Sequence, residues 1–372
     1  MEKKGMDRVD NRLKPLLKQA LENRVFSGVA VGVYQYRSRE EQGLLSVLGK
    51  TRYDEKGTII TRDTLFDLAS LTKPLCTALC ILCLIEQKKI DWRTRIAEVL
   101  PYFFLPEYKS LEVEQLLSHS AGLIAYKPVY QTFPPAIRKE NSKELIQTFL
   151  REPLASATGT SCVYSDIGFI LLGALIEEVS GKGLDQFFRS EIAAPLQIEN
   201  AVLFRPVTPS LPGRENSAAT EQCPWRQRML QGEAHDEHAW LMNGVAGHAG
   251  LFGTITGVMT LTEHLLHQWQ GRATHPGFSN QLLQKALNKT YPGHSWCRGF
   301  DTPAAQGSSA GDYFSPRSVG HLGYTGTSFW IDPERDIVVV LLTNRVHPTR
   351  SNEQIKQFRP LLHNTVLAAL RE

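Results

Sequence analysis

The chain has 372 residues, of which 42% are hydrophobic and 21% are charged, and its formal net charge is +3. This composition is typical of a globular protein, and the length allows two domains or one domain with a large insertion. The small net charge, with no basic face interleaved with aromatic residues, argues against a nucleic-acid partner.

The N-terminal segment, Met1 to Asp10, is polar and charged and lacks the apolar core of a signal peptide. The most apolar stretch, Leu75 to Ile85, is about 11 residues long, whereas a membrane-spanning helix needs about 20. Three of the six cysteines, Cys76, Cys80 and Cys83, share one face of this stretch, where they are expected to pack as small hydrophobic groups. We therefore expect a cytoplasmic protein with no membrane partner.

The first elements are a helix and a hairpin. Apolar residues recur at helical spacing from Arg8 to Asn23, which predicts an amphipathic helix. Gly28 to Tyr36 and Gly43 to Gly49 are typical of strands, and the charged segment Arg37 to Glu41 between them predicts a turn. A helix followed by antiparallel strands indicates an α+β fold.

The middle of the chain, from about Leu68 to Leu196, has the character of helices and loops. The predicted helices are Ser70 to Gln87, Val113 to Leu117, Ser142 to Phe149, Ile167 to Val179 and Leu184 to Ile192. Residues 203–233 are rich in proline and in polar and charged residues, which predicts an irregular segment.

Strands return near the end of the chain. Ser328 to Ile331 and Ile337 to Thr343 flank a turn-forming segment, and a final helix is predicted from Pro360 to Leu370, with the proline in its first turn. The order of elements predicts one antiparallel sheet built from N- and C-terminal strands and flanked by helices, with an all-α insertion. We expect residues 1–68 and 241–372 to form the sheet domain, residues 69–240 the helical domain, and the active site to lie in the cleft between them.

The first chemical motif is Ser70-Leu-Thr-Lys73, where an extended segment enters a helix. At this position the Ser70 hydroxyl lies near free backbone N–H groups, and Lys73 projects from the same helix face. A serine hydroxyl becomes a good nucleophile only when a base takes its proton, and a lysine can serve if its surroundings keep it neutral. Alone, this pattern is weak evidence of function, because a helix cap followed by a surface lysine gives the same pattern.

Two further segments carry candidate site residues. Tyr164-Ser165-Asp166 precedes a predicted helix, so it is either a cap behind a packed tyrosine or a phenol facing Ser70 and Lys73. The segment from Gly320 to Thr327 contains three glycines that let the backbone approach a ligand closely, and a strand edge there would supply an N–H group to an oxyanion. A plain hairpin turn is the alternative.

In this order and spacing, Ser70-x-x-Lys73, Tyr164-Ser-Asp166 and His321-x-Gly323 resemble the motifs of the serine β-lactamase and penicillin-binding-protein superfamily. The most similar branch is the class C β-lactamase-like group of esterases, D-aminopeptidases and cell-wall amidases. Further matching segments are residues 116–123 (LLSHSAGL), 244–252 (GVAGHAGLF), 330–334 and 342–348.

The resemblance implies that Ser70 forms an acyl-enzyme, that Lys73 and Tyr164 handle the proton, and that the N–H groups of Ser70 and Tyr324 form the oxyanion hole. Two positions differ from the common pattern of the family. Asp166 stands where an asparagine is common, so it is expected to hold Lys73 protonated and to shift the role of base to Tyr164. His321 replaces a common lysine, which removes a cation that would bind a β-lactam carboxylate.

Other residues are candidates for binding. His321 is expected to orient Tyr164 or the substrate and to impart a pH dependence near neutrality, and Gly323 to line the oxyanion site. His235 is expected either to line the cleft or to lie in a solvated loop. Arg345 is expected to bind an anionic group of the substrate or to pair with a carboxylate of a loop. His235 and His238 are three residues apart, which does not match the spacing of a zinc-binding helix, so no metal is expected.

The residues and the resemblance together predict a serine acyl hydrolase that acts on a small ester or amide without a cofactor. The alternatives are an amidase of peptidoglycan fragments, a D-amino-acid peptidase, and an acyltransferase with the same residues. A fourth alternative, from another class, is a non-catalytic sensor or binding protein that keeps the fold.

Overall fold

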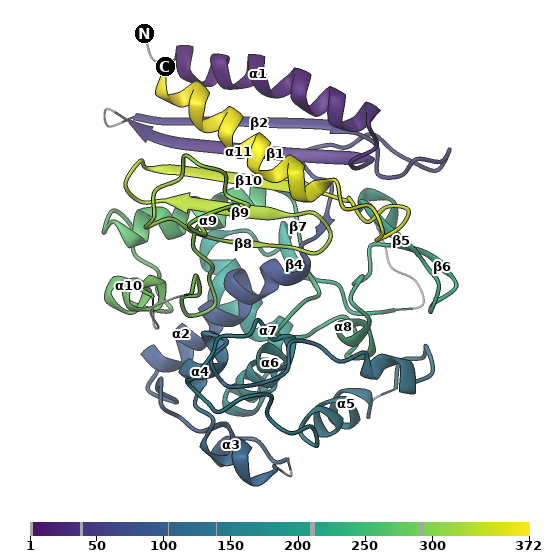
Figure 1. Ribbon diagram of the computed structural model, residues 1–372, viewed down its shortest axis with the longest axis vertical. Coiled ribbons are helices and arrows are strands. Elements are labelled where there is room, and N and C mark those ends of the chain that lie inside the picture. Colours follow the sequence, from purple (N-terminus) through teal and green to yellow (C-terminus); the bar gives the residue numbers. More distant parts are fainter. Residues whose placement is uncertain (1–2, 38–39, 103, 139, 209–212, 290–293) are drawn as a thin grey trace.

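A five-stranded antiparallel sheet joins the two ends of the chain (Figure 1). The computed structural model describes residues 3–37, 40–102, 104–138, 140–208, 213–289 and 294–372. The strand order is β2-β1-β10-β9-β8, with bounds β1 Gly28–Arg37, β2 Glu40–Gly49, β8 Val319–Leu322, β9 Ser328–Asp332 and β10 Ile337–Thr343. The predicted α+β fold, with a sheet from N- and C-terminal strands, is confirmed. Residues 38–39, in the predicted hairpin turn, lie outside the described residues.

Helices cover both faces of this sheet. Successive side chains along a strand point to opposite faces, so they enter two different cores. Val29, Val31 and Val33 of β1 pack with α1 (Lys3–Glu22) and α11 (Ile355–Arg371) on the outer face. Ala30 and Tyr34 point to the other face and join the main core, which includes α9 (Ile255–Trp269). Figure 1 shows α1 and α11 side by side, with the two chain ends close together.

The remaining helices lie mostly on the far side of the sheet from α1 and α11 (Figure 1). Their bounds are α2 Leu79–Glu86, α3 Ile96–Val99, α4 Val113–Leu117, α5 Asn141–Phe149, α6 Asp166–Ser180, α7 Leu184–Phe188, α8 Glu237–Leu241 and α10 Asn280–Leu287. The helices predicted in the middle of the chain are thus confirmed. The division into residues 1–68 with 241–372 and residues 69–240 stays a prediction.

The segment that carries Ser70 is a buried helix. A 3₁₀ turn (Ala69–Leu71) and a π-helical stretch (Lys73–Ala78) run directly into α2. Within the described part of the chain, one segment, Ala69–Glu86, has the length and apolar composition to cross a membrane, and 83% of it is buried inside the protein. Its apolar character is therefore explained by its place in the core.

The prediction that residues 203–233 are irregular was wrong in part. The segment contains a hairpin of β5 (Ala219–Cys223) and β6 (Arg228–Gln231), while residues 209–212 lie outside the described residues. Glu233, which is fully buried, accepts hydrogen bonds from Arg228 and from Trp240 Nε1. The buried carboxylate of Glu233 is therefore satisfied, although it belongs to a segment whose composition suggested a loop.

The start of the last helix was also predicted wrongly. Helix α11 begins at Ile355, and Pro360 lies inside it, not in its first turn. Ile355 and Phe358 are buried against the sheet, and Phe358 packs edge-to-face on Phe26 at 5.2 Å between ring centroids. This apolar packing compensates for the backbone hydrogen bond that a proline cannot donate.

Candidate active site

Ser70 lies at a strained turn between a short strand and the buried helix. Strand β3 (Phe66–Asp67) pairs with β7 (Leu251–Gly253), and Ala69 then adopts a left-handed conformation with φ of 47°. The Asp67 carboxylate stabilises this turn, since its Oδ1 accepts from the Ala69 N–H at 2.8 Å. Because the helix starts at this point, the Ser70 side chain lies next to the helix N-terminus, as expected for a nucleophile.

Lys73 is fully buried beside Ser70. Its Nζ donates to Ser70 Oγ at 3.1 Å, to Asp166 Oδ1 at 2.7 Å and to the His248 carbonyl at 3.1 Å. Three acceptors match the three hydrogens of an ammonium group. The surroundings of Lys73 are therefore built for its charged form.

The electrostatics of Lys73 agree with this geometry. Burial lowers the pKa of Lys73, but the charges of Asp166 and Tyr164 and their hydrogen bonds outweigh burial, so the pKa lies above its usual value. This agrees with the expectation that Asp166 holds Lys73 protonated. Lys73 can accept the Ser70 proton only after it has passed one of its own to another group.

Tyr164 is the second proton-handling candidate, and the structure brings it to Ser70 and Lys73. Its hydroxyl interacts electrostatically with both side chains, and Lys73 Nζ lies 4.8 Å from the centroid of its ring. Burial, and then the charge of Asp166, raise the pKa of Tyr164 above its usual value, although Lys73 opposes this. The resting site therefore pairs an ammonium with a neutral phenol, so neither group is a free base before substrate arrives.

The segment from Gly323 to Thr327 is tied to the turn that carries Ser70. Thr325 Oγ1 donates to the Asp67 carbonyl at 2.7 Å, and Thr327 Oγ1 donates to the Leu68 carbonyl at 3.2 Å. An added Cβ on Gly323 would lie 1.9 Å from Thr327 Oγ1 and 2.7 Å from the Leu68 oxygen. Only glycine allows this close approach, which brings the Tyr324 backbone next to the Ser70 turn.

His321 on β8 is buried beneath Tyr164, with their ring centroids 5.8 Å apart. Its Nδ1 donates to the Leu322 carbonyl at 2.8 Å. Burial, with a smaller effect of the Lys73 charge, lowers the pKa of His321 to about 3. The predicted pH dependence near neutrality is therefore wrong for His321, because the ring stays neutral throughout that range.

The other predicted binding residues gather around the Tyr324 side chain, which is half-exposed. The His235 ring stacks on the Tyr324 ring at 5.7 Å, and the Arg345 guanidinium lies 4.4 Å from the centroid of the same ring. His235 Nε2 pairs with Glu221 Oε2 at 3.1 Å. Arg345 donates to the carbonyls of Tyr324, Arg350 and Asn352, so it holds this loop together, and any contact with a substrate stays a prediction.

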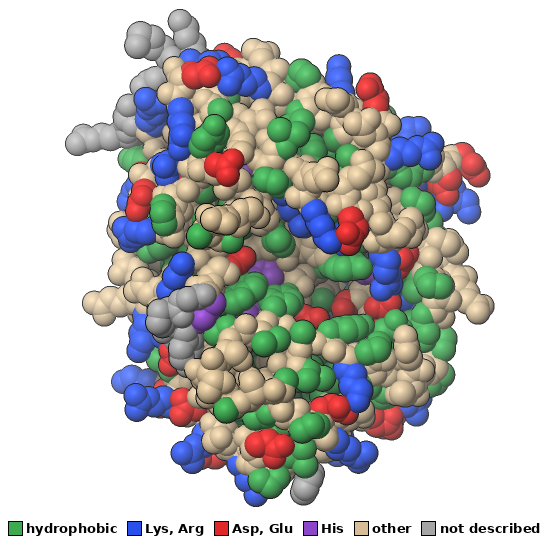
Figure 2. Space-filling view, in the orientation of Figure 1, with side chains coloured by type: hydrophobic (Ala, Val, Ile, Leu, Met, Phe, Trp, Pro, Cys, Tyr) green, Lys and Arg blue, Asp and Glu red, His purple; other side chains and the backbone are tan. Residues whose placement is uncertain are grey.

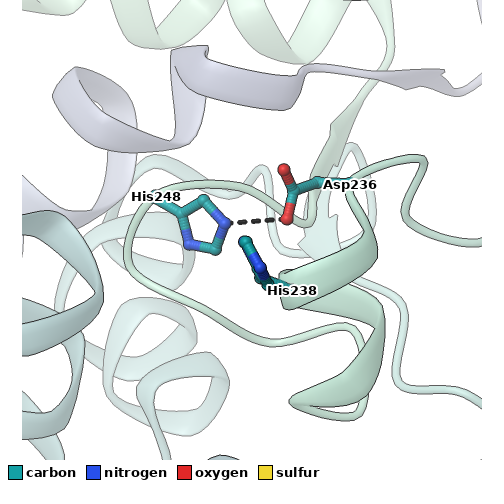
Figure 3. Close-up of side chains that lie close together, drawn as sticks. All are labelled: Asp236, His238 and His248. Carbon is teal, nitrogen blue, oxygen red and sulfur yellow. Dashed lines mark hydrogen bonds and ion pairs between the residues drawn. The ribbon is translucent and has the colours of Figure 1, made fainter. Parts of the chain in front are cut away.

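Asp236, His238 and His248 form a compact group behind Lys73 (Figure 3), whose possible metal-ligating atoms all lie within 4.8 Å of one another. Asp236 Oδ1 accepts from His248 Nε2 and from the Ala239 N–H, both at 2.8 Å. His238 Nε2 accepts from the Tyr130 N–H at 3.2 Å. These hydrogen bonds engage one possible ligand atom of each residue, and the Lys73 bond to the His248 carbonyl links the group to the site. We interpret it as a support for Lys73.

Two residues at the site were not assigned a role from the sequence. His119 lies 4.7 Å from the Tyr164 ring, and Trp296 lies 5.2 Å from it, between centroids. His119 belongs to the segment 116–123, which carried the resemblance but gave no reason to single it out. Trp296 has no local signal in the sequence, because only the folded chain brings it to Tyr164.

Figure 2 shows a depression on one face of the molecule, with histidine and acidic side chains visible in and around it. An open approach of this kind suits an enzyme whose nucleophile must meet a substrate from solution.

The comparisons with known proteins agree with this geometry. Residues 13–363 match the model of the Beta-lactamase family. An N-acetylmuramyl-L-alanine amidase of Bacillus subtilis (strain 168) is 32% identical over 310 residues, which cover 76% of this chain and 68% of the relative. A putative D-alanyl-D-alanine carboxypeptidase of Escherichia coli (strain K12) is 28% identical over 314 residues, covering 79% and 72%.

Solved structures show the same fold at lower identity. EstCE1, described as a hydrolase with promiscuous acyltransferase activity, superposes with a TM-score of 0.73 at 20% identity, covering 95% of this chain and 99% of EstCE1. The octameric penicillin-binding protein homologue from Pyrococcus abyssi gives a TM-score of 0.71 at 17% identity, covering 97% and 80%.

Proposed function

Since the chain belongs to the Beta-lactamase family of serine hydrolases, and is a serine acyl hydrolase of amides or esters, we propose that its substrates are amides of peptidoglycan fragments. The observation that carries this proposal is the 32% identity to an N-acetylmuramyl-L-alanine amidase over 76% of the chain. The second relative is named a putative D-alanyl-D-alanine carboxypeptidase, and the bond that this name specifies is also an amide.

In the proposed mechanism, Ser70 Oγ attacks the amide carbonyl carbon and forms the tetrahedral intermediate. The N–H groups of Ser70 and Tyr324 stabilise the oxyanion, a kind of interaction for which one donor typically contributes about 2.7–4 kcal/mol. The Ser70 proton passes through Tyr164 and Lys73 to the leaving nitrogen, the C–N bond breaks, and an ester remains on Ser70. Water then cleaves this ester and restores the serine hydroxyl.

The charge of the site disfavours a β-lactam. The ring of His321, at the position where a lysine is common, is neutral at pH 7 because its pKa is about 3. A β-lactam carboxylate therefore finds no cation at this position. We expect slow turnover of nitrocefin compared with the natural amide.

A panel of three substrate types tests the proposal. It contains N-acetylmuramyl-L-alanine peptides, peptides ending in D-alanyl-D-alanine, and p-nitrophenyl esters, each measured with wild type and with Ser70→Ala. We expect the highest kcat/KM for one of the two cell-wall amides and no turnover by S70A. Turnover confined to the p-nitrophenyl esters contradicts the proposal and supports a carboxylesterase.

A further inference from the structure

The segment after α4 contains a histidine with an unusual backbone. His119 is buried, and its φ of 58° is in the left-handed region that few residues other than glycine adopt. Asparagine, aspartate and histidine are the side chains that occur most often in this conformation. The strain is therefore tolerable at this position, and its presence indicates that the surrounding contacts hold it in place.

His119 accepts hydrogen bonds from the residues before and after Tyr164. The Val163 N–H donates to the His119 carbonyl at 2.9 Å, and the Ser165 N–H donates to His119 Nδ1 at 3.1 Å. The residue between these two bonds is Tyr164, whose ring lies 4.7 Å from the His119 ring, tilted by 42°. One residue thus holds the backbone on either side of the tyrosine and also contacts its ring.

The protonation of His119 is fixed by these partners. A backbone N–H can only donate, so Nδ1 must be the acceptor and the neutral ring carries its hydrogen on Nε2. Burial, and then the charge of Lys73, place the pKa of His119 well below its usual value. The acceptor is therefore present over the whole working pH range.

A second aromatic side chain completes the contact. The centroid of the Trp296 ring lies 4.8 Å from that of His119 and 5.2 Å from that of Tyr164. The tyrosine ring is therefore in contact with two aromatic rings, those of His119 and Trp296. Ser70 and Lys73 lie on one helical segment, whereas Tyr164 lies in a loop just before α6. The position of Tyr164 therefore depends on side-chain contacts such as those with His119 and Trp296.

We propose that His119 is a positioning residue, which holds Tyr164 beside Ser70 and Lys73 by accepting the Ser165 N–H and packing on the tyrosine ring. This inference rests on the proposed role of Tyr164 in proton transfer. It assigns His119 no contact with the substrate.

The test measures the rate at which a fluorophosphonate phosphonylates Ser70, with loss of fluoride, by intact-mass analysis, so it does not depend on the natural substrate. His119→Ala removes the acceptor and the ring, and we expect the rate to fall about 10²-fold, as for a displaced catalytic group. His119→Asn places an amide oxygen where Nδ1 was and tolerates a positive φ. We expect its rate to stay within about threefold of wild type.

A double-mutant cycle with Tyr164→Phe separates positioning from a general structural role. If His119 acts through Tyr164, His119→Ala costs little once the phenol is gone, so H119A/Y164F and Y164F react at equal rates. The inference is overturned if H119N is as slow as H119A, if H119A is as fast as wild type, or if H119A slows Y164F as much as it slows wild type.

Further controls separate a loss of activity from a loss of folding. Thermal unfolding is recorded for each variant. If H119A does not fold, His119→Asn is compared with His119→Leu, because the two side chains have the same shape but only asparagine can accept the Ser165 N–H. His275→Ala is the matched control, because His275 is also buried and its Nδ1 accepts a backbone N–H, from Gly277 at 3.0 Å, away from the site. A Y164F variant as fast as wild type contradicts the role of Tyr164 itself, which separates that failure from the failure of His119.

Discussion

At the scale of single residues, the site is defined by how charge is shared among three side chains. Lys73 contacts both a nucleophile and a carboxylate, and its pKa lies above its usual value because Asp166 and Tyr164 outweigh burial. The pKa of Tyr164 is also raised, first by burial. In the proposed mechanism the attack of Ser70 therefore needs one proton to move through the pair, and we expect Asp166 to set the pH at which this becomes possible.

Replacing Asp166 by asparagine tests this electrostatic role. The negative charge raises the pKa of Lys73 and of Tyr164, so its removal lowers both, and the base becomes available at lower pH. We expect the acidic limb of the pH profile of kcat/KM to move down by about 1–3 pH units, as an opposite charge at contact distance typically produces. The measurement is the pH dependence of kcat/KM for D166N.

The control for this prediction is Asp54→Asn, which removes a surface carboxylate paired with Arg52 at 2.5 Å. Its profile should match that of wild type. An acidic limb of D166N that stays in place, or that moves to higher pH, would show that Asp166 does not control the proton.

The contact between Ser70 and Lys73 was easier to predict from the sequence than the environment of the candidate site. Ser70 and Lys73 are three residues apart on one helix, so their contact is local and follows from helical geometry. The His119 contact with Ser165 and the Lys73 contact with the His248 carbonyl join segments distant in the chain. Such contacts depend on the packed core, which local patterns do not specify. The neutral state of His321 was missed for the same reason, because burial determines it.

At the scale of elements, the site is formed where the edge of the sheet meets the helix that carries Ser70. β8 is the edge strand of the five-stranded sheet, and the segment after it is tied by Thr325 and Thr327 to the carbonyls of Asp67 and Leu68. On its outer side β8 already bonds to Asp301 through Gly320, so an unpaired N–H group for an oxyanion has to come from the segment that follows the strand.

Replacing Gly323 by alanine tests this junction. The added Cβ would meet Thr327 Oγ1 and the Leu68 carbonyl, so the segment must move away from the Ser70 turn. We expect kcat to fall about 10²–10³-fold, as for the loss of one oxyanion donor, with a smaller change in KM. Steady-state kinetics measure both constants.

Gly43→Ala is the comparison for this variant, since its added Cβ approaches nothing closer than 3.9 Å. It should keep the activity of wild type. If G323A also keeps that activity while it folds normally, the Tyr324 backbone does not take part in the reaction.

The elements themselves were largely predictable, and the failures have a physical cause. The strands of the large sheet carry β-branched residues, and the helices carry apolar residues at helical spacing, so local propensity and burial agree. In residues 203–233 they disagree, because the Glu233 carboxylate is buried there and accepts hydrogen bonds from Arg228 and Trp240. A polar stretch that satisfies itself inside the protein looks like a loop in the sequence.

At the scale of the whole molecule, the sheet separates a structural layer from the site. α1 and α11 pack in their own core on the outer face, while the helix with Ser70 lies in the main core on the other face (Figure 1). Arg359 of α11 reaches through to the site, donating to the carbonyls of Gly323 and Thr327 at 2.7 and 2.9 Å. The rest of the outer layer is expected to affect stability but not chemistry.

Leu362→Ala tests this separation. Leu362 is fully buried in the core between α11 and the sheet, and truncation of a buried leucine typically lowers the free energy of unfolding by about 2–5 kcal/mol. We expect that loss in a denaturant titration, with kcat and KM unchanged at 25 °C. Leu361, its neighbour on the same helix, is 52% exposed, so Leu361→Ala should cost much less. Equal losses in stability, or a change in kcat for L362A, would argue against a purely structural outer layer.

The most direct test of the whole account is the covalent modification of Ser70. Wild type is incubated with a fluorophosphonate, and the adduct is located by intact-mass and peptide-mass analysis. The account predicts one adduct per chain, on the peptide that contains Ser70, absent in Ser70→Ala and formed much more slowly in Lys73→Ala. A wild type that forms no adduct, or an adduct that persists in S70A, would contradict it.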